Sequence, residues 1–181
     1  METVEPIKSE QKIAEMKEAL LYYGGKRDEF YFTLAINCGL RCGDILKLKK
    51  KDIKDFKLRI KETKTSKLFE LPLDHKYKEI SEYIKFLDDE DYLFASRNGD
   101  KPISRVQAHR ILKRASESIG LERISNHSLR KTFGYFYYRR TSNIATLMEL
   151  FNHSSQGVTL RYIGVHQEEL SKSFSSTFGG L

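Results

Sequence analysis

The sequence has few of the residues that cross-link a chain or interrupt its regular structure. Among its 181 residues there are only two cysteines and three prolines. Two cysteines, Cys38 and Cys42, are too few for a disulfide framework or a zinc site, so buried free thiols in a reducing cytoplasm are the simpler interpretation. The scarcity of proline and the absence of repeats or low-complexity stretches argue against a flexible linker between two domains.

A long hydrophobic run is also missing. The most apolar stretch, residues 30–40, is interrupted by Thr33 and Asn37 and is too short to span a membrane. The acidic and polar start of the chain does not resemble a signal peptide. We therefore expect a soluble, cytoplasmic protein without membrane contact. The expected organisation is an N-terminal tail, one domain and a flexible C-terminal tail, at residues 1–7, 8–174 and 175–181.

Acidic residues are outnumbered by basic ones. The formal net charge is +7, the sequence pI is about 9.3, and 31% of the residues are charged. A polyanionic partner fits this excess, because lysine and arginine that neutralise phosphates release condensed counterions. A mildly basic protein with no such partner would have the same composition, so charge alone does not choose between the two.

Hydrophobic spacing predicts helices over most of the chain. A first helix would begin after Ser9 as its N-cap and stop at a Gly-Gly pair, and a second, apolar on nearly all sides, would cover residues 27–38 and end at Gly39. Alternating apolar residues at 56–60 and 71–73 predict a β-hairpin or small sheet around a lysine-rich turn. A later helix would bury a stripe formed by Leu129, Phe133 and Phe136. The expected fold is mainly α-helical with one small antiparallel β-sheet, an α+β domain.

One candidate anion site is a His-x-x-Arg pair. His127 and Arg130 are three residues apart, so they lie on the same face of a helix. Ser125 or Asn126 would cap that helix and leave free amides and the positive end of its dipole beside both side chains. A phosphate would bind well there. For an isolated pair, however, a polar surface turn with a capping histidine is the more common situation.

Two further residues gain meaning only from their order in the chain. His153 directly follows an apolar helix, where a single histidine is typically a hydrogen-bonded boundary residue. Tyr162 is one of ten tyrosines, most of which should pack or stack. Together with the upstream basic residues, however, they form a recognisable series.

This series resembles the catalytic domain of the tyrosine recombinase, or phage integrase, family. That family has an arginine in a Gly-Leu-Arg turn before an acidic residue, a lysine in a β-hairpin turn (often Lys-Thr), and a His-x-x-Arg motif. It ends with a histidine in a Gly-His-Ser-Ser-like turn and a tyrosine nine residues later. The matching positions here are Arg41, Lys64, His127, Arg130, His153 and Tyr162. The resemblance covers about residues 8–174 and implies the fold of that catalytic domain.

The resemblance implies strand cleavage and rejoining without a metal or nucleotide cofactor. Tyr162 would attack a DNA phosphate, forming a 3′-phosphotyrosine and a free 5′-hydroxyl, and the covalent link would conserve the bond energy for rejoining. Arg41 and Arg130 would stabilise the non-bridging oxygens, for which a planar donor fork suits better than an ammonium. The implied enzyme is a site-specific DNA recombinase.

The proton transfers are also assigned by the resemblance. Lys64 would protonate the leaving 5′-oxygen, with Lys67 of the same turn as its competitor. His127 would accept the phenol proton, since a tyrosine of pKa near 10 is a weak nucleophile at neutral pH. His153 would donate a hydrogen bond to a phosphate oxygen.

Other basic residues are candidates for holding the DNA backbone. They flank the Gly-Leu-Arg turn, occupy the hairpin turn or decorate the polar side of one later helix. The candidates are Lys47, Lys49, Lys67, Arg105, Arg110 and Arg114. For each run a solvated surface without a ligand is the competing interpretation.

The resemblance also implies partners. The substrate would be double-stranded DNA of a phage or another mobile element, bound at the nucleoid by a homotetramer; the sequence leaves the oligomeric state in the absence of DNA open, and a monomer is one option. Accessory DNA-bending proteins are among the partners that the family allows. Residues 168–174 form an amphipathic segment that we expect to dock on a neighbouring protomer.

Two departures from the family pattern keep alternatives open. Phe151-Asn152 replaces the usual Leu-Gly before the second histidine, although asparagine also tolerates the left-handed conformation. The DNA-clamping domain that usually precedes the catalytic one has no counterpart in the few residues before the first expected helix. A catalytically silent DNA-binding module that regulates a full-length recombinase is one alternative, and a type IB topoisomerase-like enzyme is the other.

Overall fold

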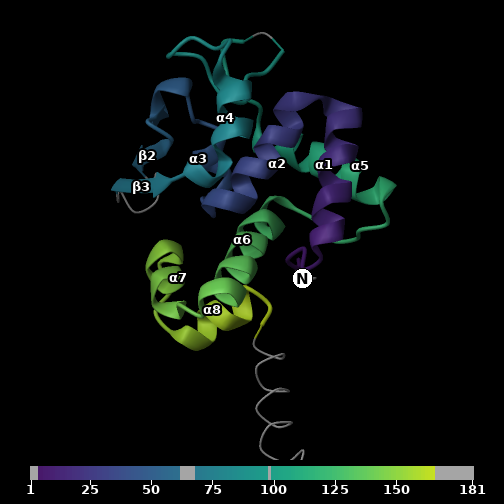
Figure 1. Ribbon diagram of the computed structural model, residues 1–181. Coiled ribbons are helices and arrows are strands. Elements are labelled where there is room, and N and C mark those ends of the chain that lie inside the picture. Colours follow the sequence, from purple (N-terminus) through teal and green to yellow (C-terminus); the bar gives the residue numbers. More distant parts are fainter. Residues whose placement is uncertain (1–3, 62–67, 98, 166–181) are drawn as a thin grey trace, which may run out of the picture.

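The computed structural model of the chain describes residues 4–61, 68–97 and 99–165. It is mainly helical, with one small antiparallel sheet, as predicted (Figure 1). The α-helices are α1 (Glu10–Gly24), α2 (Lys26–Cys38), α3 (Cys42–Ile45), α4 (Tyr77–Ile84), α5 (Arg105–Ser118), α6 (Asn126–Thr141), α7 (Ile144–Phe151) and α8 (Gln156–Tyr162). The remaining elements are the strands β1 (Ile53–Lys54), β2 (Lys57–Lys61) and β3 (Leu68–Pro72) and the short 3-10 helices η1 (Lys50–Asp52) and η2 (Asp74–Lys76).

Local signals place the ends of the first helices where the sequence predicts them. The Ser9 side chain accepts a hydrogen bond from the backbone of α1, and Gly25, with φ of +79°, ends the helix. Gly39 ends α2 in the left-handed conformation that glycine adopts without steric cost. These ends matter for function because the Gly39 turn leads directly into Arg41.

The sheet has the order β1-β2-β3, with both pairs antiparallel. Residues 57–61 of β2 pair with residues 68–72 of β3, which is the predicted hairpin; the third strand is the short β1. The lysine-rich turn, with Lys64 and Lys67, lies outside the described residues.

The main core is formed by α1, α2 and α5 together with residues from α3, α4 and the sheet. Its largest fully buried side chains are Tyr31, Phe32, Phe94, Met16 and Leu20. A second, smaller core lies at the opposite end of α6, where α7 and α8 pack together (Figure 1). We call it the C-terminal core, and its buried residues are Leu147, Leu150, Phe151, Ile163 and Val165.

Helix α6 joins these two cores, which changes the burial of its predicted stripe. Leu129 is buried in the main core, but Phe133 and Phe136 are only half-buried. Both phenylalanines line a hollow of about 310 Å³ between α2, the sheet and α6. The stripe is incomplete because beyond its first turns α6 leaves the main core.

The N-terminal residues described here pack on the domain. Residues 4–7, which the sequence assigns to a tail, run beside α6, and Pro6 and Ile7 are buried. The backbone N–H of Ile7 donates to Oγ1 of Thr132 over 2.8 Å. This part of the expected tail is therefore attached to the folded body. The expected C-terminal tail lies outside the described residues.

Candidate active site

The first arginine is presented by the turn between α2 and α3. Arg41 is the N-cap residue of α3 and has an extended backbone. A side chain at Gly39 would collide with the Phe133 ring, so glycine allows α6 to pack directly on this turn. The close approach brings Arg41 next to the His-x-x-Arg pair of α6.

Helix α6 begins with the cap that the sequence predicts. Ser125 Oγ accepts a hydrogen bond from the backbone N–H of His127 over 3.2 Å, and the backbone N–H of Ser125 donates to Ser128 Oγ, also over 3.2 Å. His127 is exposed in the first turn, whereas Arg130, one turn later, is only 6% exposed. The cap thus places one exposed imidazole and one buried cation at the same helix end.

Arg130 is held by the C-terminal core. One guanidinium nitrogen donates to the carbonyl of Leu150 over 3.2 Å, and the group stacks 4.6 Å from the centre of the Phe151 ring. Both contacts orient the planar group without neutralising its charge. A buried cation that keeps its charge is suited to bind an anion.

The turn that carries His153 keeps its geometry despite the Phe-Asn replacement. Asn152 adopts the left-handed conformation with φ of +57°, and the backbone N–H of His153 donates to the carbonyl of Met148 over 2.9 Å. This 6→1 bond is the Schellman arrangement that a glycine would give at the same place. The expectation that asparagine preserves the turn is confirmed.

His153 is oriented by a buried threonine of α8. Nδ1 of its ring lies 3.1 Å from Oγ1 of Thr159, which is fully buried and also lies 3.2 Å from the carbonyl of Ser155. Burial, followed by the charges of Arg130 and Arg41, lowers the pKa of His153 from its ordinary value of 6.5. The ring is therefore neutral at pH 7, with one nitrogen engaged by Thr159.

Tyr162 is the last residue of α8 and is half-buried. Its ring centre lies 5.1 Å from that of His153 and 5.3 Å from that of Phe151, both edge-to-face. Burial raises the pKa of Tyr162, and the nearby Arg130 and Arg41 oppose the rise without cancelling it. The phenol is protonated at neutral pH, so attack on a phosphate requires a proton acceptor.

These residues line one pocket of about 580 Å³. Five of the six predicted catalytic residues line it, contributed by four segments of the chain: Arg41, His127, Arg130, His153 and Tyr162. The sixth, Lys64, and its competitor Lys67 are outside the described residues. Among those that are described, no three His, Cys, Asp or Glu side chains gather as metal ligands would.

The pocket also contains residues of α5. Arg105, expected only as a DNA contact, lies in the pocket with its guanidinium against Gly43, where any larger side chain would collide with it. His109, one turn further along α5, was not predicted. The i, i+4 spacing of these two residues is a signal that could have indicated a shared basic face.

Asn126 ties the start of α5 to the start of α6. Its amide donates to the carbonyl of Arg105 over 3.1 Å, and its oxygen accepts from the hydroxyl of Tyr31, also over 3.1 Å. Tyr31 is buried in the main core. The start of both helices is therefore anchored to the main core.

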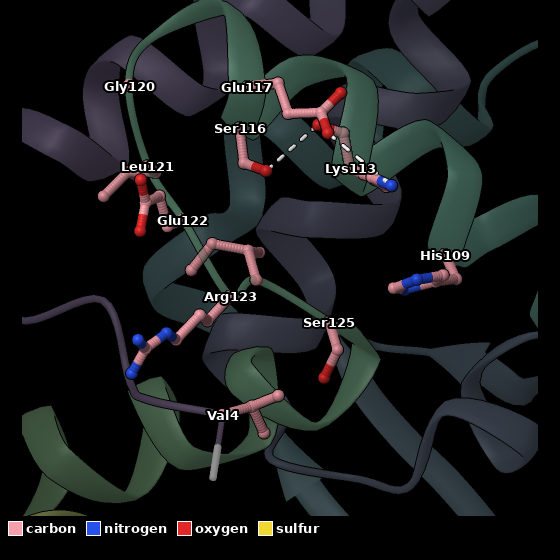
Figure 2. A pocket seen from close by; sticks show the side chains of 11 residues that line it. Val4, His109, Lys113, Ser116, Glu117, Gly120, Leu121, Glu122, Arg123 and Ser125 are labelled. Carbon is pink, nitrogen blue, oxygen red and sulfur yellow. Dashed lines mark hydrogen bonds and ion pairs between the residues drawn. The ribbon is translucent and has the colours of Figure 1, made fainter. Parts of the chain in front are cut away.

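A second hollow of about 600 Å³ adjoins the candidate active site (Figure 2). His109 and Ser125 line both hollows. Figure 2 shows His109 on the far side from Val4, with Arg123 and Ser125 on the segment between them. This second hollow has mixed charge, because Glu117 and Glu122 line it beside Lys113 and Arg123.

The remaining candidate DNA contacts differ in how strongly they already interact within the protein. Lys47 and Arg110 are exposed, whereas Arg114 stacks 4.5 Å from the centre of the Tyr23 ring. Lys49 donates to Glu90 over 2.8 Å, and this bond, with the one from Lys51, lowers the pKa of Glu90 to about 2. Lys47 and Arg110 can approach DNA without breaking a contact of that kind.

Comparison with known proteins identifies the family of this chain. Residues 9–169 match the model of the Phage integrase family, so the chain belongs to that family. It is 47% identical over 184 residues to the probable integrase/recombinase YoeC of Bacillus subtilis (strain 168), and the match covers all of both chains. It is 31% identical over 137 residues to a probable integrase/recombinase of Acholeplasma phage L2, covering 74% of this chain and 47% of that protein.

Solved structures show the same fold. The XerA recombinase structure has a TM-score of 0.76 at 18% identity, covering 98% of this chain and 66% of that one. The lambda integrase catalytic core has a TM-score of 0.66 at 19% identity, covering 83% of this chain and 92% of that one. The predicted fold and the predicted family, that of integrases and tyrosine recombinases, are confirmed. Within residues 4–61, 68–97 and 99–165, every helix is too short or too polar to span a bilayer.

Proposed function

We propose that this chain is a site-specific recombinase that cleaves and rejoins DNA through a covalent 3′-phosphotyrosine on Tyr162. The observation that carries the proposal is the pocket, where two arginines and two histidines from three other segments surround this phenol. A protein that only bound DNA would have no use for a tyrosine in this position. The chain spans all of YoeC and about half of the phage L2 relative.

In the proposed reaction the arginines bind the scissile phosphate. Arg130 is buried and oriented through Leu150 and Phe151, and Arg41 lines the same pocket from the turn between α2 and α3. Preorganised donors of this kind stabilise the charge that develops on the non-bridging oxygens, and each is worth about 3–4 kcal/mol in comparable sites. Arg105, in the same pocket, would bind an adjacent phosphate.

The proposed cleavage step exchanges one bond to phosphorus for another. The phenol oxygen of Tyr162 forms a bond to phosphorus, the bond from phosphorus to the 5′-oxygen breaks, and the phenol proton passes to His127. The leaving 5′-oxygen takes a proton from Lys64 or Lys67 of the hairpin turn. Because burial raises the pKa of Tyr162, the proton acceptor is essential at neutral pH.

His153 would donate a hydrogen bond to a phosphate oxygen, which requires a proton on Nε2. Oγ1 of Thr159 donates to the carbonyl of Ser155 over 3.2 Å and lies 3.1 Å from Nδ1, so it orients the ring through Nδ1 and leaves Nε2 for the phosphate. The edge-to-face contact with Tyr162 then keeps His153 beside the attacking group.

For the assembly we propose a homotetramer on double-stranded DNA. A solved structure of similar fold is described as a lambda integrase tetramer bound to a Holliday junction, and another as a lambda integrase dimer bound to a core site. Such an enzyme would act at the nucleoid, in the cytoplasm.

The test is trapping of the covalent intermediate. Duplexes that bind the protein are selected from a randomised pool, nicked to make suicide substrates, and incubated with the protein in EDTA. We expect a denaturation-resistant protein–DNA adduct that disappears in Tyr162→Phe and persists in Tyr22→Phe, a matched change at an exposed tyrosine distant from the pocket. Tight binding without an adduct would instead support a silent DNA-binding module. Relaxation of supercoiled plasmid by the monomer would support a topoisomerase.

A further inference from the structure

The N-terminal segment Val4–Lys8, here called the strap, is hydrogen-bonded to α6. The ammonium of Lys131 donates to the carbonyl of Val4 over 2.7 Å. The backbone N–H of Ile7 donates to the buried Thr132 side chain, and Ile7 itself is 3% exposed. Figure 2 shows Val4 on the purple N-terminal trace, running past the segment that leads into α6.

The strap also contacts the turn that follows Tyr162. The ammonium of Lys8 donates to the carbonyl of Gly164 over 2.8 Å. A Cβ at Gly164 would lie 3.2 Å from Pro6, and this glycine has φ of +74°, which disfavours any other residue. The strap therefore binds α6 on one side and the end of α8 on the other.

Lys131 connects the strap with the nucleophile. Its side chain is buried between them, with the residue only 7% exposed, although a lysine is rarely buried without a specific partner. Its ammonium lies 5.4 Å from the centre of the Tyr162 ring, within the range of a cation–π contact, while it donates to Val4. Lys131 directly follows Arg130 in the sequence, yet it faces the strap rather than Leu150 and Phe151.

We propose that Lys131 is a positioning residue through which the strap holds Tyr162 in line for attack. The inference rests on the proposed function of Tyr162 as the nucleophile. The phenol is at the end of a seven-residue helix, and the C-terminal core beneath it is small. The cation against the ring face and the strap against Gly164 restrict the motion of this end of α8. In this arrangement the strap controls the fraction of time for which the Tyr162 phenol is aligned with the scissile phosphate.

The test compares full-length variants with a matched control. Lys131→Met removes the charge and the donor but keeps an unbranched apolar stem. Lys85→Met makes the same change where an ammonium lies 4.7 Å from the exposed Phe86 ring, outside the pocket. Ile7→Ala loosens the strap from its buried anchor without touching Lys131 or Tyr162. Each variant is measured for DNA affinity, for the rate of adduct formation at saturating DNA, and for amide exchange in α8 without DNA.

We expect Lys131→Met to slow adduct formation by about threefold to thirtyfold, the range of a desolvated cation–π contact, with DNA affinity nearly unchanged. Amide exchange in residues 159–165 should accelerate, while Lys85→Met changes neither quantity. Ile7→Ala should have the same two effects, and the double variant should be no slower than the stronger single one, because both act through one contact.

Opposite results would overturn the inference. If adduct formation and α8 exchange in Lys131→Met match the wild type, Lys131 does not position Tyr162. If the two substitutions slow adduct formation additively, and in proportion to the melting temperature that each one loses, their role is a general structural one. If the wild-type protein forms no adduct at all, the proposed function fails, while amide exchange still decides whether the strap restrains α8.

Discussion

The two cores of this domain carry different parts of the candidate active site. Arg41 and the start of α6 are attached to the main core, through the turn after α2 and through Tyr31 and Asn126. His153 and Tyr162 are attached to the C-terminal core, which is formed by two short helices. Regions with few buried apolar contacts open at lower free energy than the main core of a domain. Arg41 and the start of α6 are therefore tied to the larger core, and Arg130 is held by Leu150 and Phe151 of the smaller one. Tyr162, the proposed nucleophile, lies on that smaller core, which we expect to open more readily.

The largest expected effect comes from breaking the link between the two cores. Arg130→Ala removes a cation that α6 presents to the pocket and that Leu150 and Phe151 hold from the other side. Adduct formation at saturating DNA should fall by roughly 10²–10³-fold or more. Single-turnover cleavage assays measure this, with Arg139→Ala, at an exposed position later in α6, as the control. A loss of less than about tenfold would show that Arg130 does not stabilise the developing charge.

A pair of core substitutions tests whether the two cores open separately. Phe151→Ala and Phe32→Ala each remove a buried aromatic ring and should each cost about 3–5 kcal/mol of local stability. Phe32→Ala should lower the melting temperature and accelerate amide exchange throughout α1 and α2. Phe151→Ala should accelerate exchange mainly in α7 and α8 and slow adduct formation. Equal acceleration in both regions with Phe151→Ala would show a single cooperative unit.

A smaller effect is expected at the hydrogen bond that orients His153. Thr159→Val keeps the volume but removes the hydroxyl next to Nδ1, which should cost about 1 kcal/mol of stability and reduce the rate of cleavage. Thr159→Ser should restore the rate, because it keeps the hydroxyl. Nitrogen NMR shifts of His153 report the tautomer directly. An unchanged tautomer in Thr159→Val would exclude the threonine as its determinant.

The pH dependence of the C-terminal core follows from His153. Its folded pKa lies below 6.5, so below that pH the unfolded chain binds more protons than the native state. The stability that neutral His153 contributes to the C-terminal core is therefore fully present above pH 6.5. It is lost as the pH falls through the folded pKa of His153. Amide exchange in α8 between pH 7.5 and 5, corrected for the intrinsic exchange rate, should show this loss, and His153→Gln should remove it. If amide exchange in His153→Gln depends on pH as strongly as in the wild type, another titrating group causes the effect.

The smallest effect is expected at the left-handed residue before His153. Asn152→Gly restores the residue type that related enzymes usually have and should change stability by a few tenths of a kcal/mol, because asparagine already adopts φ of +57°. Asn152→Val should cost more than 1 kcal/mol, because a β-branched residue is strained there. Thermal denaturation compares the three proteins. A large increase in the melting temperature of Asn152→Gly would mean that the native turn is strained.

The sequence predicted best those features that depend on neighbouring residues. Ser9, Gly39 and Ser125 end or begin helices through contacts within a few positions, and Asn152 keeps its turn for the same reason. The alternation around residues 57–61 indicated the hairpin because one strand face is buried. It did not resolve the two-residue strand β1, which is too short to have a period.

Features that depend on distant contacts were not predictable in this way. Phe133 and Phe136 have helical spacing typical of a buried stripe, but the end of the main core leaves them half-buried. The expected tail is attached because Lys131 and Thr132 provide partners more than a hundred positions away. Arg105 and His109 face the pocket only because α5 packs beside the start of α6.

The sequence by itself indicated the family and the helical character, which are confirmed, and it supplied the residues that we propose to carry the chemistry. The family and the proposed residues come from the resemblance in residue order, whereas the helical character follows from hydrophobic spacing and local capping rules. The tertiary structure decided which of these residues meet, that Arg41 is attached to the main core and Tyr162 to the C-terminal core, and that the strap contacts Lys131. The physical reason is that burial, cation–π contacts and shifted pKa values depend on groups brought together by packing, and their separation in the sequence does not reveal them.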